Sequence, residues 1–234
     1  MSEKAKALKA AFPYTIPILT GYLFLGAAWG ILMDSKGYSV LWAALISLFT
    51  YAGSMQFVAV NLLALGFNPL YACLMTLMVN VRHLFYGIVM LDKFKGTGIM
   101  KPYLIFGLTD ETFSILCSSK PPENINKNWF IFFVTLLDHS YWILGTILGS
   151  LIGTMLTFNT KGLDFVLTSL FIVIFINQWK SSHNHVPVVI ALTSTIICRL
   201  VFGPANFIIP SMIVILILVT LLRKSMEGLE REEY

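Results

Sequence analysis

Apolar runs fill this chain almost without interruption, from Phe12 to Leu222 of its 234 residues. The runs cover residues 12–33, 39–65, 69–91, 103–118, 129–157, 163–179, 187–202 and 204–222. A helix needs about 20 consecutive apolar residues to cross a bilayer, and several runs are long enough. They are continuous, whereas the strands of a membrane β-barrel alternate apolar and polar residues. The sequence therefore predicts an all-α, polytopic helical membrane protein with about seven or eight hydrophobic segments, some of them broken or re-entrant half-helices.

The composition leaves little sequence for a soluble domain. Hydrophobic residues make up 57% of the chain and charged residues 12%, against about half and about a quarter in ordinary soluble domains. We therefore expect a single helical transmembrane domain over residues 1–234, with a short N-terminal segment at 1–11 and a polar C-terminal tail at 223–234. The N-terminal segment carries three lysines, and the positive-inside rule places it in the cytoplasm.

Several classes of function lack their usual signals in this sequence. The net charge of +4 is spread along the chain, which argues against a nucleic-acid interface. The three cysteines are scattered through apolar runs and indicate neither a disulfide framework nor a metal site. His183 and His185 lie two residues apart in the polar segment between two apolar runs, and we expect a solvated loop there and not a metal site. No Walker A, serine-hydrolase or metalloprotease motif is found, so we expect a non-enzyme without cofactors.

Counting every run as a plain crossing conflicts with the distribution of lysines. Eight crossings from a cytoplasmic N-terminus place the lysine-rich loop 92–102 outside the cell, against the positive-inside rule. The conflict disappears if 39–65 is broken near Gly53–Ser54 and re-enters, and if the short run 103–118 is re-entrant as well. Broken helices at membrane depth occur where they line a cavity or are buried in protein, and transporters often build binding sites from them.

One run carries a cluster of polar side chains at membrane depth. Asn80, Arg82 and His83 lie within 69–91, where an arginine costs about 2.5–3.5 kcal/mol on insertion scales. Folding alone does not require this cost, so we expect Arg82 to face a protein interior or a watery pathway and to have a partner. Helical spacing puts Asn80, His83 and Tyr86 on one face. Arg82 suits a carboxylate ligand, and the alternative is that it snorkels to the interface.

The run 39–65 carries a second polar group. Gln56 is an amide in an apolar surrounding and must find a hydrogen-bond partner. Gly53 and Ser54 can open the backbone there and leave peptide groups free for a ligand. The alternative is close helix packing through small residues.

Carboxylates lie well inside two of the runs. Asp110 and Glu111 are the expected charge partners of the Arg–His pair described above, and one of them is expected to be protonated because two unpaired carboxylates in a low dielectric are expensive. The alternative is an interfacial segment in which both acids are wet. Asp138 and His139 lie about ten residues into the run 129–157, where they can titrate; adjacent helical residues face differently, so the two need not interact.

Glycine patterns and polar motifs follow one another in a specific order. They are Pro17 and Gly21, Ser47 with 52–57, 79–84 with Tyr86 and Gly87, 109–111, 144–149 with Gly153, and 162–165. In this order they resemble the AzlC family, the large subunit of bacterial branched-chain amino acid exporters. The resemblance implies efflux across the bacterial cytoplasmic membrane with a small companion membrane subunit of the AzlD type. It also implies leucine, isoleucine, valine and related compounds as substrates, and the proton gradient as the energy source.

We therefore predict a subunit of a secondary active, proton-coupled exporter of branched-chain or related small apolar amino acids, embedded in the lipid bilayer of the cytoplasmic membrane. Such a zwitterion needs a cation for its carboxylate, acceptors for its ammonium and an apolar pocket. The expected residues are Gly53, Ser54, Gln56, Asn80, Arg82, His83 and Tyr86 for binding, and Asp110, Glu111, Asp138 and His139 for coupling or ion pairing. Two alternatives stay open: an intramembrane enzyme acting on a lipid or phosphate substrate, and a capture subunit of an ATP-driven importer.

Overall fold

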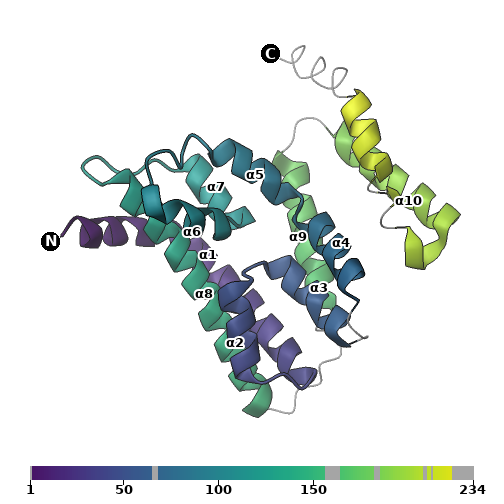
Figure 1. Ribbon diagram of the computed structural model, residues 1–234, viewed down its shortest axis with the longest axis horizontal. Coiled ribbons are helices and arrows are strands. Elements are labelled where there is room, and N and C mark those ends of the chain that lie inside the picture. Colours follow the sequence, from purple (N-terminus) through teal and green to yellow (C-terminus); the bar gives the residue numbers. More distant parts are fainter. Residues whose placement is uncertain are drawn as a thin grey trace. The chain divides into compact units, whose positions relative to one another are not determined.

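The computed structural model describes residues 2–64, 68–155, 164–181, 185–207, 210–211 and 213–222. Every regular element within these ranges is a helix, which confirms the all-α prediction (Figure 1). The helices are α1 (Glu3–Ser35), α2 (Val40–Phe49), α3 (Gly53–Ala64), α4 (Pro69–Asn80), α5 (Arg82–Met90), the 3-10 turn η1 (Gly98–Met100), α6 (Lys101–Phe106), α7 (Asp110–Ser118), α8 (Lys127–Met155), α9 (Asp164–Ser181) and α10 (Val186–Asn206), followed by the short helix Ile213–Leu222.

The chain divides into two compact units, Met1–Leu167 and Thr168–Tyr234. A single domain over the whole chain stays a prediction, and the polar tail 223–234 lies outside the described residues. In the second unit, the ring of His185 stacks on Trp179 with 4.1 Å between centroids. His183 is outside the described residues, so the expected solvated loop there also stays a prediction.

Three helices in the described ranges are long and apolar enough to cross a membrane: α1, α8 and Val186–Gly203 within α10. Helices α4 and α5 make a fourth span when they are taken together across a 49° bend. Val40–Phe49 and Ile213–Leu222 are shorter apolar helices. The predicted re-entry of two segments and the predicted side of the membrane for each loop stay predictions.

Helices α1 and α8 run side by side and in the same direction through the first unit (Figure 1). Lys4 lies 4.6 Å above the centre of the Trp129 ring near their starts. Small residues allow the two backbones to touch between these ends. A Cβ atom on Gly145 would lie only 2.7 Å from the carbonyl oxygen of Tyr22, so the α1–α8 contact requires glycine at this position.

Two hydrophobic clusters flank the middle of α8. The first joins α1, α2, α3 and α8 through Tyr22, Trp29, Met33, Ala43, Phe57, Val60 and Trp142. The second joins the start of α1, the end of α5, α6, α7 and the start of α8 through Ala11, Met90, Leu104, Leu116, Phe130 and Val134. Leu137 packs against both clusters. Asp138 and His139 are the next two residues of α8, so they lie where the two clusters meet.

The run 39–65 is broken, as predicted, but the break lies earlier than expected. Helix α2 ends at Phe49 and α3 begins at Gly53, so residues 50–52 form the connection. Tyr51 carries the turn with φ of +38°, a conformation that is uncommon for a non-glycine residue. Gly53 packs closely against the indole of Trp142: a Cβ atom at position 53 would lie only 3.1 Å from Cη2 of that ring. The glycine allows close packing, and the backbone opening comes from the residues before it.

The run 69–91 bends after Asn80, so Asn80 belongs to a different helix from His83 and Tyr86, which were expected to share a face with it. Helix α4 ends at Asn80 and α5 begins at Arg82. The His83 ring donates from Nδ1 to the Asn80 carbonyl oxygen over 3.1 Å. The Leu84 amide, which would reach that oxygen in a straight helix, donates to Val81 instead over 3.1 Å. The side chain of His83 thus competes with the backbone, and Arg82 becomes the first residue of a new helix.

Candidate functional site

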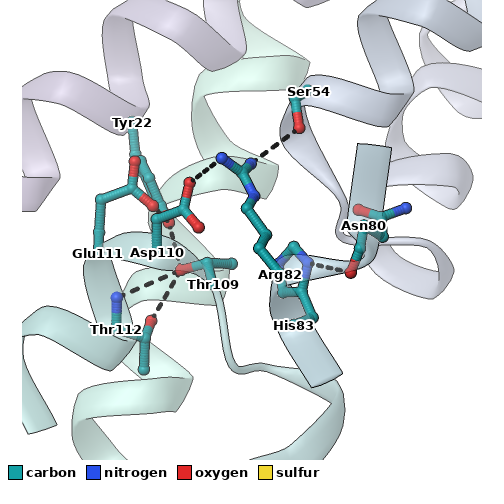
Figure 2. A network of polar contacts seen from close by, with 9 residues as sticks. All are labelled: Tyr22, Ser54, Asn80, Arg82, His83, Thr109, Asp110, Glu111 and Thr112. Carbon is teal, nitrogen blue, oxygen red and sulfur yellow. Dashed lines mark hydrogen bonds and ion pairs between the residues drawn. The ribbon is translucent and has the colours of Figure 1, made fainter. Parts of the chain in front are cut away.

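The guanidinium of Arg82 is held by two side chains from other helices (Figure 2). Its Nη1 lies 2.9 Å from Oδ2 of Asp110, and its Nη2 donates to Oγ of Ser54 over 3.2 Å. The side chains of the ion pair are 28% and 26% exposed. The expectation that an acidic partner meets Arg82 is therefore met by Asp110. Each of the three residues lies at the start of a helix that follows a break in the chain.

The helix starts explain why the acid can lie here. Asp110 and Glu111 occupy the first turn of α7, where free amides and the helix dipole stabilise negative charge. Thr109 is the N-cap, and its hydroxyl accepts from the Thr112 amide over 3.3 Å. Arg82 lies at the start of α5, where the dipole disfavours a cation. Its charge is therefore balanced by the ion pair with Asp110, and removal of either partner leaves the other uncompensated.

Glu111 turns away from Arg82 and contacts α1 (Figure 2). The Tyr22 hydroxyl lies 2.7 Å from Oε2 of Glu111 and 2.7 Å from the Thr109 hydroxyl. Tyr22 is 4% exposed. Tyr22 does not stand out in the sequence, because a tyrosine in an apolar helix carries no charge and belongs to no motif. It is the residue of α1 that joins the acidic start of α7.

Asp138 lies at the far end of the same set of contacts. Thr109 donates to the Thr112 hydroxyl over 3.1 Å, and Thr112 donates to Oδ2 of Asp138 over 2.8 Å. Both Thr112 and Asp138 are completely buried. Asp138 is a candidate from the sequence, whereas Thr112 has no signal there except its position one turn after Thr109.

His139 faces a different set of partners from Asp138, as expected for adjacent helical residues. Its Nε2 lies 3.3 Å from the Ser47 carbonyl oxygen, which can only accept, so Nε2 carries a hydrogen. The Tyr103 hydroxyl lies 3.1 Å from Nδ1, and the Tyr51 ring lies 4.3 Å away between centroids. Both ring nitrogens are thus engaged, and the histidine ties α8 to the α2–α3 connection and to α6.

Both polar atoms of the Gln56 side chain have a protein partner. Its Nε2 donates to Oγ of Ser47 over 3.2 Å, and its Oε1 accepts from the Trp142 indole over 3.0 Å. Ser47 lies in turn 2.9 Å from the Thr146 hydroxyl. This amide therefore fixes α2, α3 and α8 together, and it also lines the cavity described next.

A cavity of about 590 Å³ lies between α2, α3 and α4. Its lining is mainly apolar and includes Ile46, Met55, Leu62, Leu63, Ala72 and Cys73. Gln56 and Asn80 contribute polar groups. Gln56 and Asn80 are each two residues away in the sequence from Ser54 and Arg82, respectively, whereas Ser54, Arg82 and Asp110 are not among the lining residues.

Tyr86 and His83 support the ion pair from the side of α5. The Tyr86 ring stacks on Phe113 of α7 with 4.3 Å between centroids, and the His83 ring meets its edge at 5.5 Å. These contacts hold α5 against α7 beside the Arg82–Asp110 pair. Of the expected binding residues, the structure thus brings Ser54 and Arg82 together with Asp110, and it gives Gly53, Gln56 and His83 partners within the protein.

Comparisons with known proteins agree with the resemblance of the motifs. A family model described as AzlC protein matches residues 17–156, which include every candidate residue named above. A branched-chain amino acid transport protein AzlC from Bacillus subtilis is 52% identical over 224 residues, 96% of this chain and 88% of the relative. An uncharacterized membrane protein from Helicobacter pylori (strain ATCC 700392 / 26695) is 41% identical over 97% of this chain and 100% of its own length.

A more distant relative is the inner membrane protein YgaZ from Escherichia coli. It is 28% identical over 183 residues, which are 73% of this chain and 72% of the relative. No solved structure matches the chain.

Proposed function

Because the chain belongs to the AzlC family of membrane proteins, we propose that it is the large subunit of a secondary exporter for branched-chain or related small apolar amino acids. The proposed location is the bacterial cytoplasmic membrane with the N-terminus inside, and the proposed partner is a small AzlD-type membrane subunit. Transport, and no chemical conversion of the substrate, is the proposed activity. The substrate class rests on the name of the 52% identical Bacillus subtilis relative, a branched-chain amino acid transport protein.

The ion pair between Arg82 and Asp110 is the observation that carries this proposal. An amino acid zwitterion presents a carboxylate and an ammonium on one carbon atom. Arg82 binds the carboxylate through its planar guanidinium, and Asp110 binds the ammonium. In the empty protein each side chain neutralises the other at 2.9 Å. The substrate therefore exchanges one ion pair for two and leaves neither protein charge unpaired.

The apolar cavity supplies the second half of a binding site. Its volume of about 590 Å³ falls within the range of about 300–1,000 Å³ that is common for small-ligand sites. Leucine, isoleucine and valine share a charged head and differ in their branched tails. The proposed pose puts the head at the Arg82–Asp110 pair and the tail among the apolar residues of α3 and α4.

The test separates a ligand role of the ion pair from a structural one. Arg82→Gln and Asp110→Asn are each expected to abolish leucine transport in proteoliposomes that contain the chain and its small companion subunit. If the pair only stabilises the fold, the double variant Arg82→Gln/Asp110→Asn regains transport, because no charge is left uncompensated. If the pair binds the zwitterion, the double variant stays inactive.

An exposed ion pair provides the matched control. Lys95 and Asp92 lie 2.6 Å apart with side chains 77% and 87% exposed, so Lys95→Gln is expected to leave transport unchanged. Amounts of each variant in the membrane are measured in parallel. Leucine transport near the wild-type rate in the double variant, or in Arg82→Gln alone, overturns the proposed role. Tight leucine binding without transport by the wild-type complex would point instead to a capture subunit.

A further inference from the structure

We propose that a row of hydroxyl groups forms a proton relay between the carboxyls of Glu111 and Asp138, and that the row holds one shared excess proton. The three hydroxyls belong to Tyr22, Thr109 and Thr112. This inference rests on the proposed transport function and names the groups that would move its proton.

The contacts of the row are consecutive and short; Figure 2 shows the residues from Glu111 to Thr112, and Asp138 completes the row. Glu111 to Tyr22 and Tyr22 to Thr109 are both 2.7 Å between oxygens. Thr109 to Thr112 is 3.1 Å, and Thr112 to Asp138 is 2.8 Å. All four distances lie in or next to the range of ordinary O–H···O hydrogen bonds. The residues come from α1, the start of α7 and the middle of α8, which are far apart in the sequence.

Counting hydrogens shows that the row needs one more proton than its hydroxyls supply. Four oxygen–oxygen contacts need four hydrogens, and three hydroxyls bring three. With an ionised Glu111, Tyr22 donates to Glu111, Thr109 donates to Thr112 and Thr112 donates to Asp138, which leaves the Tyr22–Thr109 contact without a hydrogen. That contact gains a hydrogen when Glu111 is protonated and donates to Tyr22, because the Tyr22 hydroxyl can then donate to Thr109. With the opposite orientation of all three hydroxyls, the fourth hydrogen belongs to Asp138.

The two orientations are the end states of one transfer. In the first state the Glu111 carboxyl donates to Tyr22, each hydroxyl donates to the next, and Asp138 is the carboxylate. When each group passes its hydrogen along the row, the Glu111 O–H bond breaks and an Asp138 O–H bond forms. The three hydroxyls regain a hydrogen as they lose one, so the total charge of the row stays at one negative unit.

Burial isolates one end of the row from water. Thr112 and Asp138, at this end, are completely buried, and Tyr22, next to Glu111, is 4% exposed. The other end is next to Asp110, whose side chain is 26% exposed and bound to Arg82. When a substrate ammonium binds at Asp110, it stabilises an ionised Glu111 beside it and shifts the shared proton towards Asp138. The row thus links occupancy of the proposed site to a proton stored in the core.

Neighbouring titratable groups do not replace the row. Both nitrogens of His139 are engaged, with Tyr103 and with the Ser47 carbonyl oxygen. The Tyr51 ring faces the Tyr22 ring edge at 6.5 Å between centroids and also lies against His139. Arg82 faces Asp110 at the open end.

Variants that remove single hydroxyls test the relay by its effect on transport. Thr112→Val keeps the shape and removes the hydroxyl, and Tyr22→Phe does the same on α1. Each is expected to lower leucine transport driven by a pH gradient by about tenfold or more, and to leave leucine counterflow without a gradient within about twofold. Thr112→Ser, which restores a hydroxyl, is expected to recover gradient-driven transport. Wild-type gradient-driven rates in Thr112→Val overturn the relay.

Two buried residues outside the row are matched controls. The Thr135 hydroxyl donates to the Ile131 carbonyl oxygen within α8, and the Tyr141 hydroxyl lies 3.1 Å from Thr15. Thr135→Val and Tyr141→Phe are therefore expected to keep gradient-driven transport.

Infrared spectroscopy tests the shared proton without any transport assay. The purified wild-type complex at neutral pH is expected to show the C=O stretching band of a protonated carboxyl. That band is expected to disappear in the double variant Glu111→Gln/Asp138→Asn. Absence of the band in the wild type overturns the shared proton. Failure of leucine counterflow in the wild type, with the band present, overturns the proposed substrate and leaves the relay standing.

Discussion

Gly145→Ala tests how closely α1 and α8 approach at the level of the candidate site. A Cβ atom there would lie 2.7 Å from the Tyr22 carbonyl oxygen and 3.0 Å from Cα of Leu23. Ordinary contacts of a Cβ begin at 3.4 Å, so the α1 backbone has to withdraw by roughly 0.7 Å. Overpacking of this kind costs about 1–3 kcal/mol. The same shift moves the Tyr22 hydroxyl, whose contacts with Glu111 and Thr109 are 2.7 Å long.

Gly21→Ala is the matched control, because it adds the same methyl group to α1 one residue before Tyr22. A Cβ on Gly21 meets nothing within 4 Å, and alanine is favoured over glycine in a helix by about 1 kcal/mol. The unfolding midpoint of the purified complex is therefore expected to rise or stay unchanged for Gly21→Ala. For Gly145→Ala it is expected to fall by roughly 2–10 °C, together with gradient-driven transport. A midpoint for Gly145→Ala at or above that of Gly21→Ala would refute the close backbone contact.

Two further predictions concern the cavity and the bend. Ala59 lines the cavity, so Ala59→Phe is expected to raise the KM for leucine about tenfold and the KM for the smaller valine less. Competition between the two amino acids in proteoliposomes measures both changes, and equal changes would contradict a pocket for the substrate side chain. His83→Ala removes the hydrogen bond from the ring to the Asn80 carbonyl oxygen, so it is expected to straighten the α4–α5 bend and abolish transport. His83→Asn keeps a hydrogen-bond donor and is expected to retain part of the transport activity. Equal activity of the two His83 variants would show that the ring does not hold the bend.

The class of fold and the main charge contact could be predicted from the sequence, because in both cases the alternative has a large energetic cost. Long apolar runs have no alternative to helices in a bilayer, and the helices of the described residues agree. A guanidinium in an apolar run needs an acid, and only a few carboxylates lie within apolar runs. The pairing of Arg82 with Asp110 was therefore foreseeable from cost alone, although the choice between Asp110 and its neighbour Glu111 was not.

The bend after Asn80 was not predictable from the usual signals. Neither glycine nor proline lies near it, and the run 69–91 reads as one continuous span. The cause is a single hydrogen bond from the His83 ring to the backbone, with an energy near that of the backbone bond that it replaces. Such a competition depends on the ring's surroundings, here the edge of Tyr86. Local sequence does not contain that information.

The charged residues alone, Glu111 and Asp138, do not reveal the proposed proton relay, because the hydroxyl groups between them carry no charge. Asp138 stood out because a buried carboxylate is expensive, whereas Tyr22 and Thr112 can lie in an apolar helix at little cost. A row of hydroxyls becomes visible only when the helices that carry them are brought together. Tyr22 reaches α7 because α1 lies against α8, and α1 can lie there because position 145 has no side chain. The hydroxyl row therefore depends on the glycine of the packing interface, and a substitution at position 145 should be measurable in the function of the row.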